Sequence, residues 1–260
     1  MIDQDGVIIN SQYQTTQNIK PLIKELLAQD VAIVPNSDTP IQRLRNNIEG
    51  WLGFLPQTLI GEKGAVIEHQ GLCGLVKNIY GIEVYLEKLQ NLFTQQGATV
   101  YVGDSATWIQ NKKIFKPNSQ LLIIDSFRQQ SIGVYFLTSD FLGKTHIDST
   151  WSKDALKLIN TLVLPEGLDS LDYNPKYGIA IANASGATKK DGFSLIKNLF
   201  TDAQFFMIGD QTADFIGDAS VVQCAVNNAS DEYKKVSSFV AKQNFTSGLA
   251  ECLEWIKQYY

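Results

Sequence analysis

Short apolar segments of strand character alternate with amphipathic helical segments in the first 66 residues and again from about Thr188 to the end of the chain. Residues 31–34, VAIV, have the character of a buried strand, and residues 19–28 place leucine and isoleucine side chains on one helical face. Such alternation is typical of a parallel sheet whose strands are joined by crossover helices. The sequence therefore predicts an α/β fold with a Rossmann-like parallel-sheet core.

The pattern changes between about His69 and Ile181, where the strand-like runs become longer. Two such runs, 120–125 and 131–138, are interleaved with amphipathic helical segments at 82–96 and 153–161. This interleaving is typical of an open, partly antiparallel α+β sheet.

The return of the first pattern after this region indicates a core that is split in sequence. We expect a catalytic core made of residues 1–66 and 183–260, with an inserted α+β domain at 67–182. A chain of 260 residues with 44% hydrophobic residues is long and apolar enough for two such units.

Composition excludes several classes of partner. The formal net charge is −5, from 27 acidic and 22 basic residues, and no block of lysine or arginine is present to follow a nucleic-acid backbone. No apolar run approaches the roughly 18 residues that span a bilayer, and acids stand where a secretory signal carries basic and apolar residues. We expect a cytoplasmic protein that binds neither nucleic acid nor membrane, and the sequence makes no prediction of its oligomeric state.

The three cysteines, Cys73, Cys224 and Cys252, are widely separated and include no C-x-x-C pair. Their odd number and spacing favour neither a disulfide framework nor a zinc site. We interpret all three as buried thiols.

Two acids near the start of the chain have the spacing of an acid–base pair. Asp3 and Asp5 leave a short apolar start at positions i and i+2, so that their carboxyl groups can point the same way, and Gly6 permits a sharp turn beside them. One carboxylate can then attack a substrate while the other transfers protons.

Three further segments place polar side chains where strands of such a sheet end, the edge at which open α/β sheets bind ligands. Ser37 follows the strand-like residues 31–34 and can donate a hydrogen bond to a phosphoryl oxygen. Lys189 begins a helix, where an ammonium group and the helix N-terminus both favour an anion, although the adjacent Lys190 could face the site instead. Asp210 and Asp214 lie about one helical turn apart after the strand-like residues 204–208 and suit a hard, oxygen-seeking cation.

These motifs, in this order, resemble those of the haloacid dehalogenase-like superfamily of phosphatases. The resemblance comprises D-Q-D-G at 3–6, Ser37, Lys189 and G-D-Q-T-A-D at 209–214, and it covers nearly the whole chain. More narrowly, the chain is similar to the Cof-type and sucrose-phosphatase-like branch, which carries a large α/β cap between its second and third motifs. Residues 62–67 match that branch's E-N-G-A-hydrophobic segment with Lys63 in place of Asn, and residues 188–193 fit its S-K-G-x-A-L helix start.

The resemblance implies a magnesium-dependent phosphatase that hydrolyses a small phosphomonoester, with sugar phosphates as the expected class. Asp3 would attack phosphorus to form an aspartyl-phosphate, and Asp5 would act as general acid and then general base. Mg²⁺ would be held by Asp3, the backbone carbonyl of Asp5, Asp210 and Asp214. Ser37 and Lys189 would bind the transferring phosphoryl group.

Two other functions remain open. The phosphomannomutases share this architecture and also carry Ser-Asp after the second strand, as at Ser37 and Asp38, but the inserted domain has a single arginine, Arg128, where such an enzyme has an arginine-rich substrate segment. The other alternative is a non-catalytic ligand-binding protein that kept the fold. The retention of Asp3, Asp5, Asp210 and Asp214 together argues against it.

Overall fold

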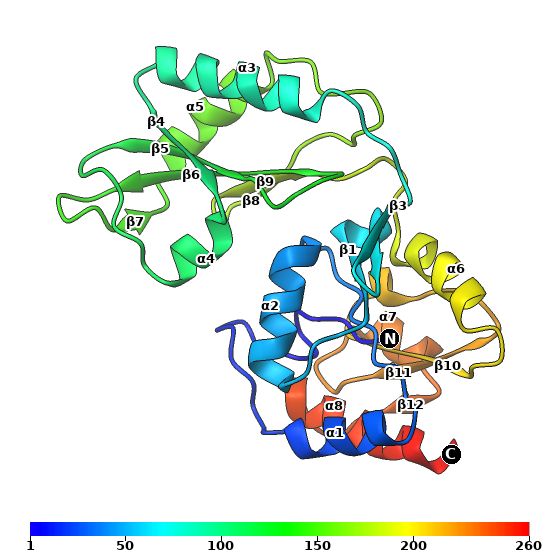
Figure 1. The fold of residues 1–260 in the computed structure, drawn as a ribbon. Coiled ribbons are helices and arrows are strands. Elements are labelled where there is room, and N and C mark those ends of the chain that lie inside the picture. Colours follow the sequence, from blue (N-terminus) through cyan, green and yellow to red (C-terminus); the bar gives the residue numbers. More distant parts are fainter. Residues whose placement is uncertain (260) are drawn as a thin grey trace. The chain divides into compact units, whose positions relative to one another are not determined.

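The computed structural model describes residues 1–259, which form two compact units. Among these residues, unit 1 comprises 1–76 and 187–259, and unit 2 comprises 77–186 (Figure 1). We had expected these boundaries at 66/67 and 182/183. The first lies ten residues later because Val66–His69 pairs with Thr58–Gly61 in an antiparallel hairpin and thereby stays with the core. No helix among residues 1–259 is both long and apolar enough to cross a membrane.

Unit 1 contains helices, strands and short 3₁₀ turns from both parts of the chain. They are α1 (Lys20–Ala28), α2 (Ile41–Leu52), β1 (Thr58–Gly61), η1 (Glu62–Gly64), β2 (Val66–His69), β3 (Leu72–Leu75), α6 (Lys189–Leu199), β10 (Phe205–Gly209), η2 (Thr212–Asp214), β11 (Val221–Ala225), α7 (Asp231–Val236), β12 (Phe239–Val240), α8 (Phe245–Ile256) and η3 (Lys257–Tyr259).

Two short extended segments complete the parallel sheet of unit 1. Residues 1–3 lie between residues 33–37 on one side and β10 on the other, since Ile2 forms parallel bridges to both Pro35 and Ile208. Residues 33–37 in turn bridge to Ile60 of β1, and β10, β11 and β12 pair in parallel. Numbered along the chain, the six strand segments therefore lie in the order 3-2-1-4-5-6, which is the order of the Rossmann fold.

Helices pack on this sheet through their apolar faces. α6 packs against β1 and η1, whereas α8 packs against β10 and β11. α1 and α8 lie side by side (Figure 1), and Lys257 after α8 forms a 2.7 Å ion pair with Glu25 of α1. The core of the sheet is therefore covered by helices drawn from both ends of the chain.

Unit 2 is an α+β domain around a mixed sheet. Its elements are α3 (Ile82–Gln95), β4 (Thr99–Gly103), α4 (Ser105–Gln110), β5 (Gln120–Asp125), β6 (Ile132–Ser139), β7 (Thr145–His146), α5 (Ser149–Ile159), β8 (Asp172–Asn174) and β9 (Ile179–Ala182). The strand order is β4-β5-β6-β9-β8, with β7 on β6, and the pairs are antiparallel apart from β4 and β5.

Both faces of this sheet are packed, as the continuous apolar sequence of β5 requires. Leu122 and Ile124 join a cluster with Phe93 of α3 and Trp151 of α5, while the alternate residues of β5 join Trp108 of α4 on the other face. The expected fold class, a Rossmann-like parallel core with an inserted α+β domain, is confirmed.

One of the three cysteines is not buried as the sequence predicted. Cys224 and Cys252 are buried free thiols as expected, but Cys73 is exposed because it lies on β3, the outer strand of the hairpin that follows β1.

Candidate active site

The acids predicted from the first and fourth motifs lie where the strand order reverses. Asp3 ends the first strand segment, and its backbone N–H donates to the carbonyl of Ile208 in β10 at 3.0 Å. Asp210 directly follows β10. From the first strand segment the chain continues to residues 33–37 on one side, whereas from β10 it continues to β11 on the other side. Such a switch point is where ligands bind in open α/β sheets.

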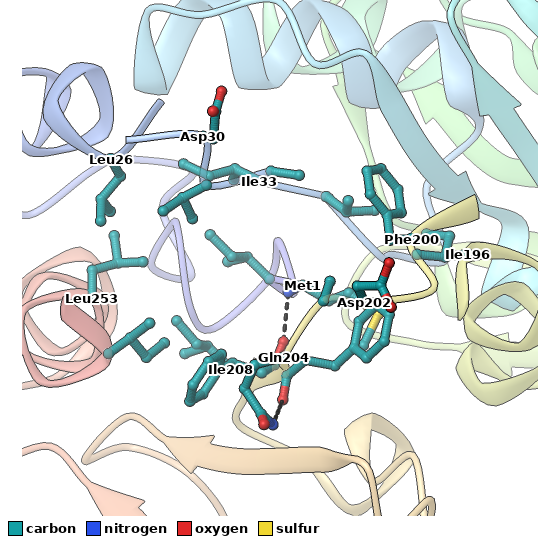
Figure 2. A pocket seen from close by; sticks show the side chains of 18 residues that line it. Met1, Leu26, Asp30, Ile33, Ile196, Phe200, Asp202, Gln204, Ile208 and Leu253 are labelled. Atoms are coloured by element: carbon teal, nitrogen blue, oxygen red, sulfur yellow. Dashed lines mark hydrogen bonds between the residues drawn. The ribbon is translucent and has the colours of Figure 1, made fainter. Parts of the chain in front are cut away.

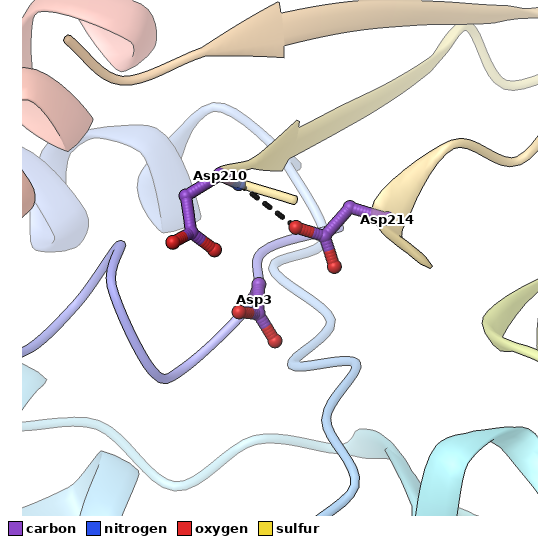
Figure 3. Close-up of side chains that lie close together, drawn as sticks. All are labelled: Asp3, Asp210 and Asp214. Carbon is purple, nitrogen blue, oxygen red and sulfur yellow. Dashed lines mark hydrogen bonds between the residues drawn. The ribbon is translucent and has the colours of Figure 1, made fainter. Parts of the chain in front are cut away.

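Asp3, Asp210 and Asp214 form one buried cluster (Figure 3). One carboxylate oxygen from each lies within 4.8 Å of those of the other two. Asp214 is brought back toward Asp210 by a tight turn, because its Oδ2 accepts the backbone N–H groups of Asp210 at 2.8 Å and Gln211 at 3.0 Å. The segment that joins Asp210 to Asp214 forms the 3₁₀ turn η2, which these bonds close.

Lys189 is the first residue of α6, and its ammonium group reaches this cluster. Thr188 is the N-cap residue of this helix, and its backbone N–H donates to Asp191 Oδ2 at 2.7 Å. Lys189 is buried and donates hydrogen bonds to Oδ1 of both Asp3 and Asp214. Lys190, by contrast, is exposed, so Lys189 is the lysine of this pair that reaches the acid cluster.

Burial and crowding disfavour the ionised form of the acids. Loss of hydration raises the pKa of Asp3 well above its usual range, against the attraction of Lys189, and the neighbouring Asp214 and Asp5 raise it further. Burial likewise raises the pKa of Asp210 to about 6, with Asp214 adding to the effect. Lys189 stays charged because Asp3 and Asp214 raise its pKa by more than burial lowers it.

The donor set fits a hard divalent cation. Three carboxylates with oxygens within 4.8 Å of one another match the all-oxygen ligation that Mg²⁺ and Ca²⁺ require. Three carboxylates face the single ammonium group of Lys189, and a bound cation would supply the missing positive charge.

Asp5 lies beside the cluster and is held through Gln4. The residue as a whole is exposed, but loss of hydration at its carboxyl group raises the pKa of Asp5 to about 6, and repulsion from Asp38 adds to the effect. Gln4 Nε2 donates to Asp5 Oδ2 at 3.1 Å.

Ser37 is fully buried at the carboxyl end of the second strand segment, next to the first. Its Oγ accepts the backbone N–H of Thr39 at 3.2 Å, which leaves the hydroxyl hydrogen available to another acceptor. Within residues 1–259 no hydrogen bond joins Ser37 to the acid cluster, so the structure brings together Asp3, Lys189, Asp210 and Asp214 directly and places Ser37 on the adjacent strand.

Gly6 permits the turn that the sequence predicted beside these acids. Its φ of 82° is in the left-handed region, and a Cβ on it would lie 2.6 Å from Cγ of Asp210. The carbonyl of Gly6 accepts a hydrogen bond from Asn228 Nδ2 at 2.8 Å, which ties the turn to the loop after β11.

Two glutamines that contact the acids were missed by the sequence analysis. Gln4 binds Asp5, and Gln211 Nε2 donates to Asp210 Oδ2 at 3.0 Å. Each glutamine is adjacent in sequence to an aspartate of a motif. This adjacency is the sequence feature that could have indicated a contact with the acids. The apolar cavity of about 430 Å³ in Figure 2 is a different region of unit 1, since it is lined by residues such as Ile33, Phe200 and Leu253 and by none of the clustered acids.

No protein-family model and no curated protein matches the sequence. Solved structures match nearly the whole chain. A haloacid dehalogenase-like hydrolase from Bacteroides thetaiotaomicron is 16% identical with a TM-score of 0.65, covering 98% of this chain and 97% of its own. BT1666 from the same organism, described among phosphatases of the haloalkanoate (HAD) enzyme superfamily, is 16% identical with a TM-score of 0.58 over 98% and 93%.

A third neighbour, a putative HAD/COF-like hydrolase from Plasmodium vivax, is 15% identical with a TM-score of 0.61, covering 100% of this chain and 95% of its own. At these identities the likeness concerns the fold. The resemblance inferred from the motifs and the similarity of the structures agree, and the chain has the fold of the haloacid dehalogenase-like hydrolases, including Cof-like members.

Proposed function

We propose that this protein is a magnesium-dependent phosphatase that hydrolyses a small, soluble phosphomonoester through an aspartyl-phosphate on Asp3. The observation that carries the proposal is the convergence of Asp3, Asp210, Asp214 and Lys189 at the switch point of the sheet. A structural neighbour described as a phosphatase of the same superfamily supports the reaction class.

Asp3 is the proposed nucleophile. It is buried, so water competes little for its oxygens, and the ammonium group of Lys189 holds Oδ1 in place. A carboxylate oxygen attacks phosphorus, the bond from phosphorus to the ester oxygen breaks, and water later hydrolyses the acyl phosphate.

Asp5 is the proposed general acid and base. A pKa raised to about 6 allows its carboxyl group to be protonated for donation to the leaving oxygen and then, as carboxylate, to accept a proton from the attacking water. Its exposure supports this role, because substrate and water can reach it.

Lys189 and Ser37 would stabilise negative charge on the transferring group. Phosphoryl transfer depends mainly on positioning and on compensation of charge on the equatorial oxygens. Lys189 supplies a fixed cation, and Ser37 has a hydroxyl hydrogen that its bond from Thr39 does not use.

Mg²⁺ would be held by Asp3, Asp210, Asp214 and the backbone carbonyl of Asp5. With Asp5 included, four carboxyl groups lie near the single ammonium group of Lys189. Without a metal ion, the excess negative charge would repel a phosphate dianion. When bound, the cation supplies the positive charge that lets phosphate and carboxylate approach each other.

Because the motifs resemble those of the Cof-type and sucrose-phosphatase-like branch, we propose that the substrate is a sugar phosphate or a similar small metabolite. We also propose that the protein acts in the cytoplasm. A screen of phosphorylated metabolites with Mg²⁺, with released phosphate and sugar isomers both measured, tests the proposal. Release of phosphate that is abolished by a chelator supports it. Isomerised sugar phosphate would indicate a phosphomutase, and tight binding without turnover would indicate a ligand-binding protein.

A further inference from the structure

Gln4 is a buried carboxamide between the two acids of the first motif. Its side chain is almost fully excluded from solvent, at 3% exposure. A buried amide without partners costs free energy, so its hydrogen bonds indicate what keeps it there.

Three hydrogen bonds fix the orientation of this amide. Nε2 donates to Asp5 Oδ2 and to Thr39 Oγ1, each at 3.1 Å, and Oε1 accepts from Asn47 Nδ2 of α2 at 3.1 Å. Rotation of the amide by 180° would set its oxygen against the Asp5 carboxylate and its NH₂ group against that of Asn47. The network therefore admits one arrangement.

The consequence for Asp5 is that one of its two oxygens is held. With Oδ2 bound to Gln4, the carboxyl group cannot rotate freely, and Oδ1 is left to exchange a proton with a ligand. Asp5 is otherwise exposed, where a short acidic side chain would sample several rotamers.

We propose that Gln4 is a positioning residue for Asp5: it fixes the carboxyl group that transfers protons, and it is itself held by Asn47 and Thr39. This inference rests on the proposed function, because it concerns the acid and base of that reaction. It adds a residue whose side chain acts through Asp5.

Gln4→Met tests this inference, because methionine is close to glutamine in size but forms no such hydrogen bonds. Two substrates report on Asp5: an alkyl phosphate, whose poor leaving group needs a proton, and an aryl phosphate, whose good leaving group needs little help. Because general acid–base catalysis contributes about 10²–10⁴-fold, we expect kcat/KM to fall about 10-fold or more for the alkyl phosphate and less than about 3-fold for the aryl phosphate. Gln42→Met, the same change on the exposed face of α2, should leave both values unchanged.

A double-mutant cycle separates positioning from general disruption. In an Asp5→Asn background, Gln4→Met should change kcat/KM for the alkyl phosphate by less than about 2-fold, because the group through which it acts is gone. An equal loss for both substrates, or an undiminished effect in the Asp5→Asn background, would overturn the proposal.

A crystal structure of Gln4→Met provides a readout that needs no activity. We expect the Asp5 carboxyl group to leave its present orientation or to occupy several. An unchanged, well-ordered Asp5 would refute the role of Gln4 even if the protein hydrolysed no phosphate. Failure of the unmodified protein to hydrolyse either substrate would instead count against the proposed function.

Discussion

Lys189 donates a hydrogen bond to Asp214, which lies 25 residues further along the chain, and the same ammonium group bonds to Asp3. The ammonium group of Lys189, at the start of α6, thus lies among acids that follow two neighbouring strands. Removal of the lysine would leave carboxylates buried without their partner.

Lys189→Met should lower the free energy of unfolding of the metal-free protein by about 3 kcal/mol at pH 7.5, because breaking a buried ion pair leaves an uncompensated charge. Denaturant titration measures the loss. Mg²⁺ should restore part of the stability, since it neutralises the same acids. Lys190→Met is the matched control, because Lys190 is exposed on the same helix, and a comparable loss in that variant would contradict the role of Lys189.

Asp3→Asn should abolish turnover of an aryl phosphate while the fold survives. The substitution keeps the size of the side chain but removes the carboxylate that we propose as the nucleophile and as one ligand for the cation. Released phosphate and the circular dichroism spectrum are the two measurements. Activity equal to that of the unmodified protein would show that Asp3 is not the nucleophile.

Asp5→Asn should behave differently from Asp3→Asn. Attack on an aryl phosphate needs little protonation, so phosphorylation of Asp3 should continue, whereas hydrolysis of the acyl phosphate should slow by about 10²–10⁴-fold. Acid-quenched samples should then contain phosphoenzyme that the unmodified protein does not accumulate. A variant as fast as the unmodified protein on an alkyl phosphate would exclude Asp5 as the general acid.

Asp210 should make the stability of the metal-free protein depend on pH. Its pKa is raised from 3.8 to about 6 on folding, so the folded state holds the proton more tightly, and the stability present below about pH 4 is lost as pH rises through about 6. Asp210→Asn should therefore raise the free energy of unfolding at pH 7.5 by on the order of 1–2 kcal/mol, with little change at pH 4. Thermal unfolding at the two pH values measures the difference.

Asp218 provides the control of opposite sign for that experiment. Hydrogen bonds from Ser220 and Lys197 lower its pKa, so its ionised form favours folding. Asp218→Asn should reduce stability at pH 7.5. If both variants shifted stability in the same direction, a general effect of charge removal would explain the data better than the environment of Asp210.

Local sequence patterns predicted the elements whose signal lies within the segment. The strand at 120–125 and the helix at 82–96 appear as β5 and α3 almost residue for residue. α5 begins four residues before the expected 153, because Asp148 caps it by accepting the N–H groups of Thr150 and Trp151. The periodicity of apolar residues, from which the helix was predicted, carries no information about such a cap.

Features that depend on distant partners were harder to predict. The hairpin of β2 and β3 belongs to unit 1 because β2 pairs with β1, which no pattern within residues 66–75 records. In the site, the acids could be predicted from their order along the chain. Gln4 could not, since its importance depends on Thr39 and Asn47, which only the fold brings to it.

The central position of residues 1–3 in the sheet has a consequence for biosynthesis. Asp3 is synthesised roughly 200 residues before Lys189, Asp210 and Asp214, a delay of about 10–40 s at 5–20 residues per second. Unit 2 is continuous in sequence and can fold before the second part of unit 1 has been synthesised. The acid cluster is therefore incomplete on the nascent chain, and we expect it to form only once β10 and η2 have emerged from the ribosome.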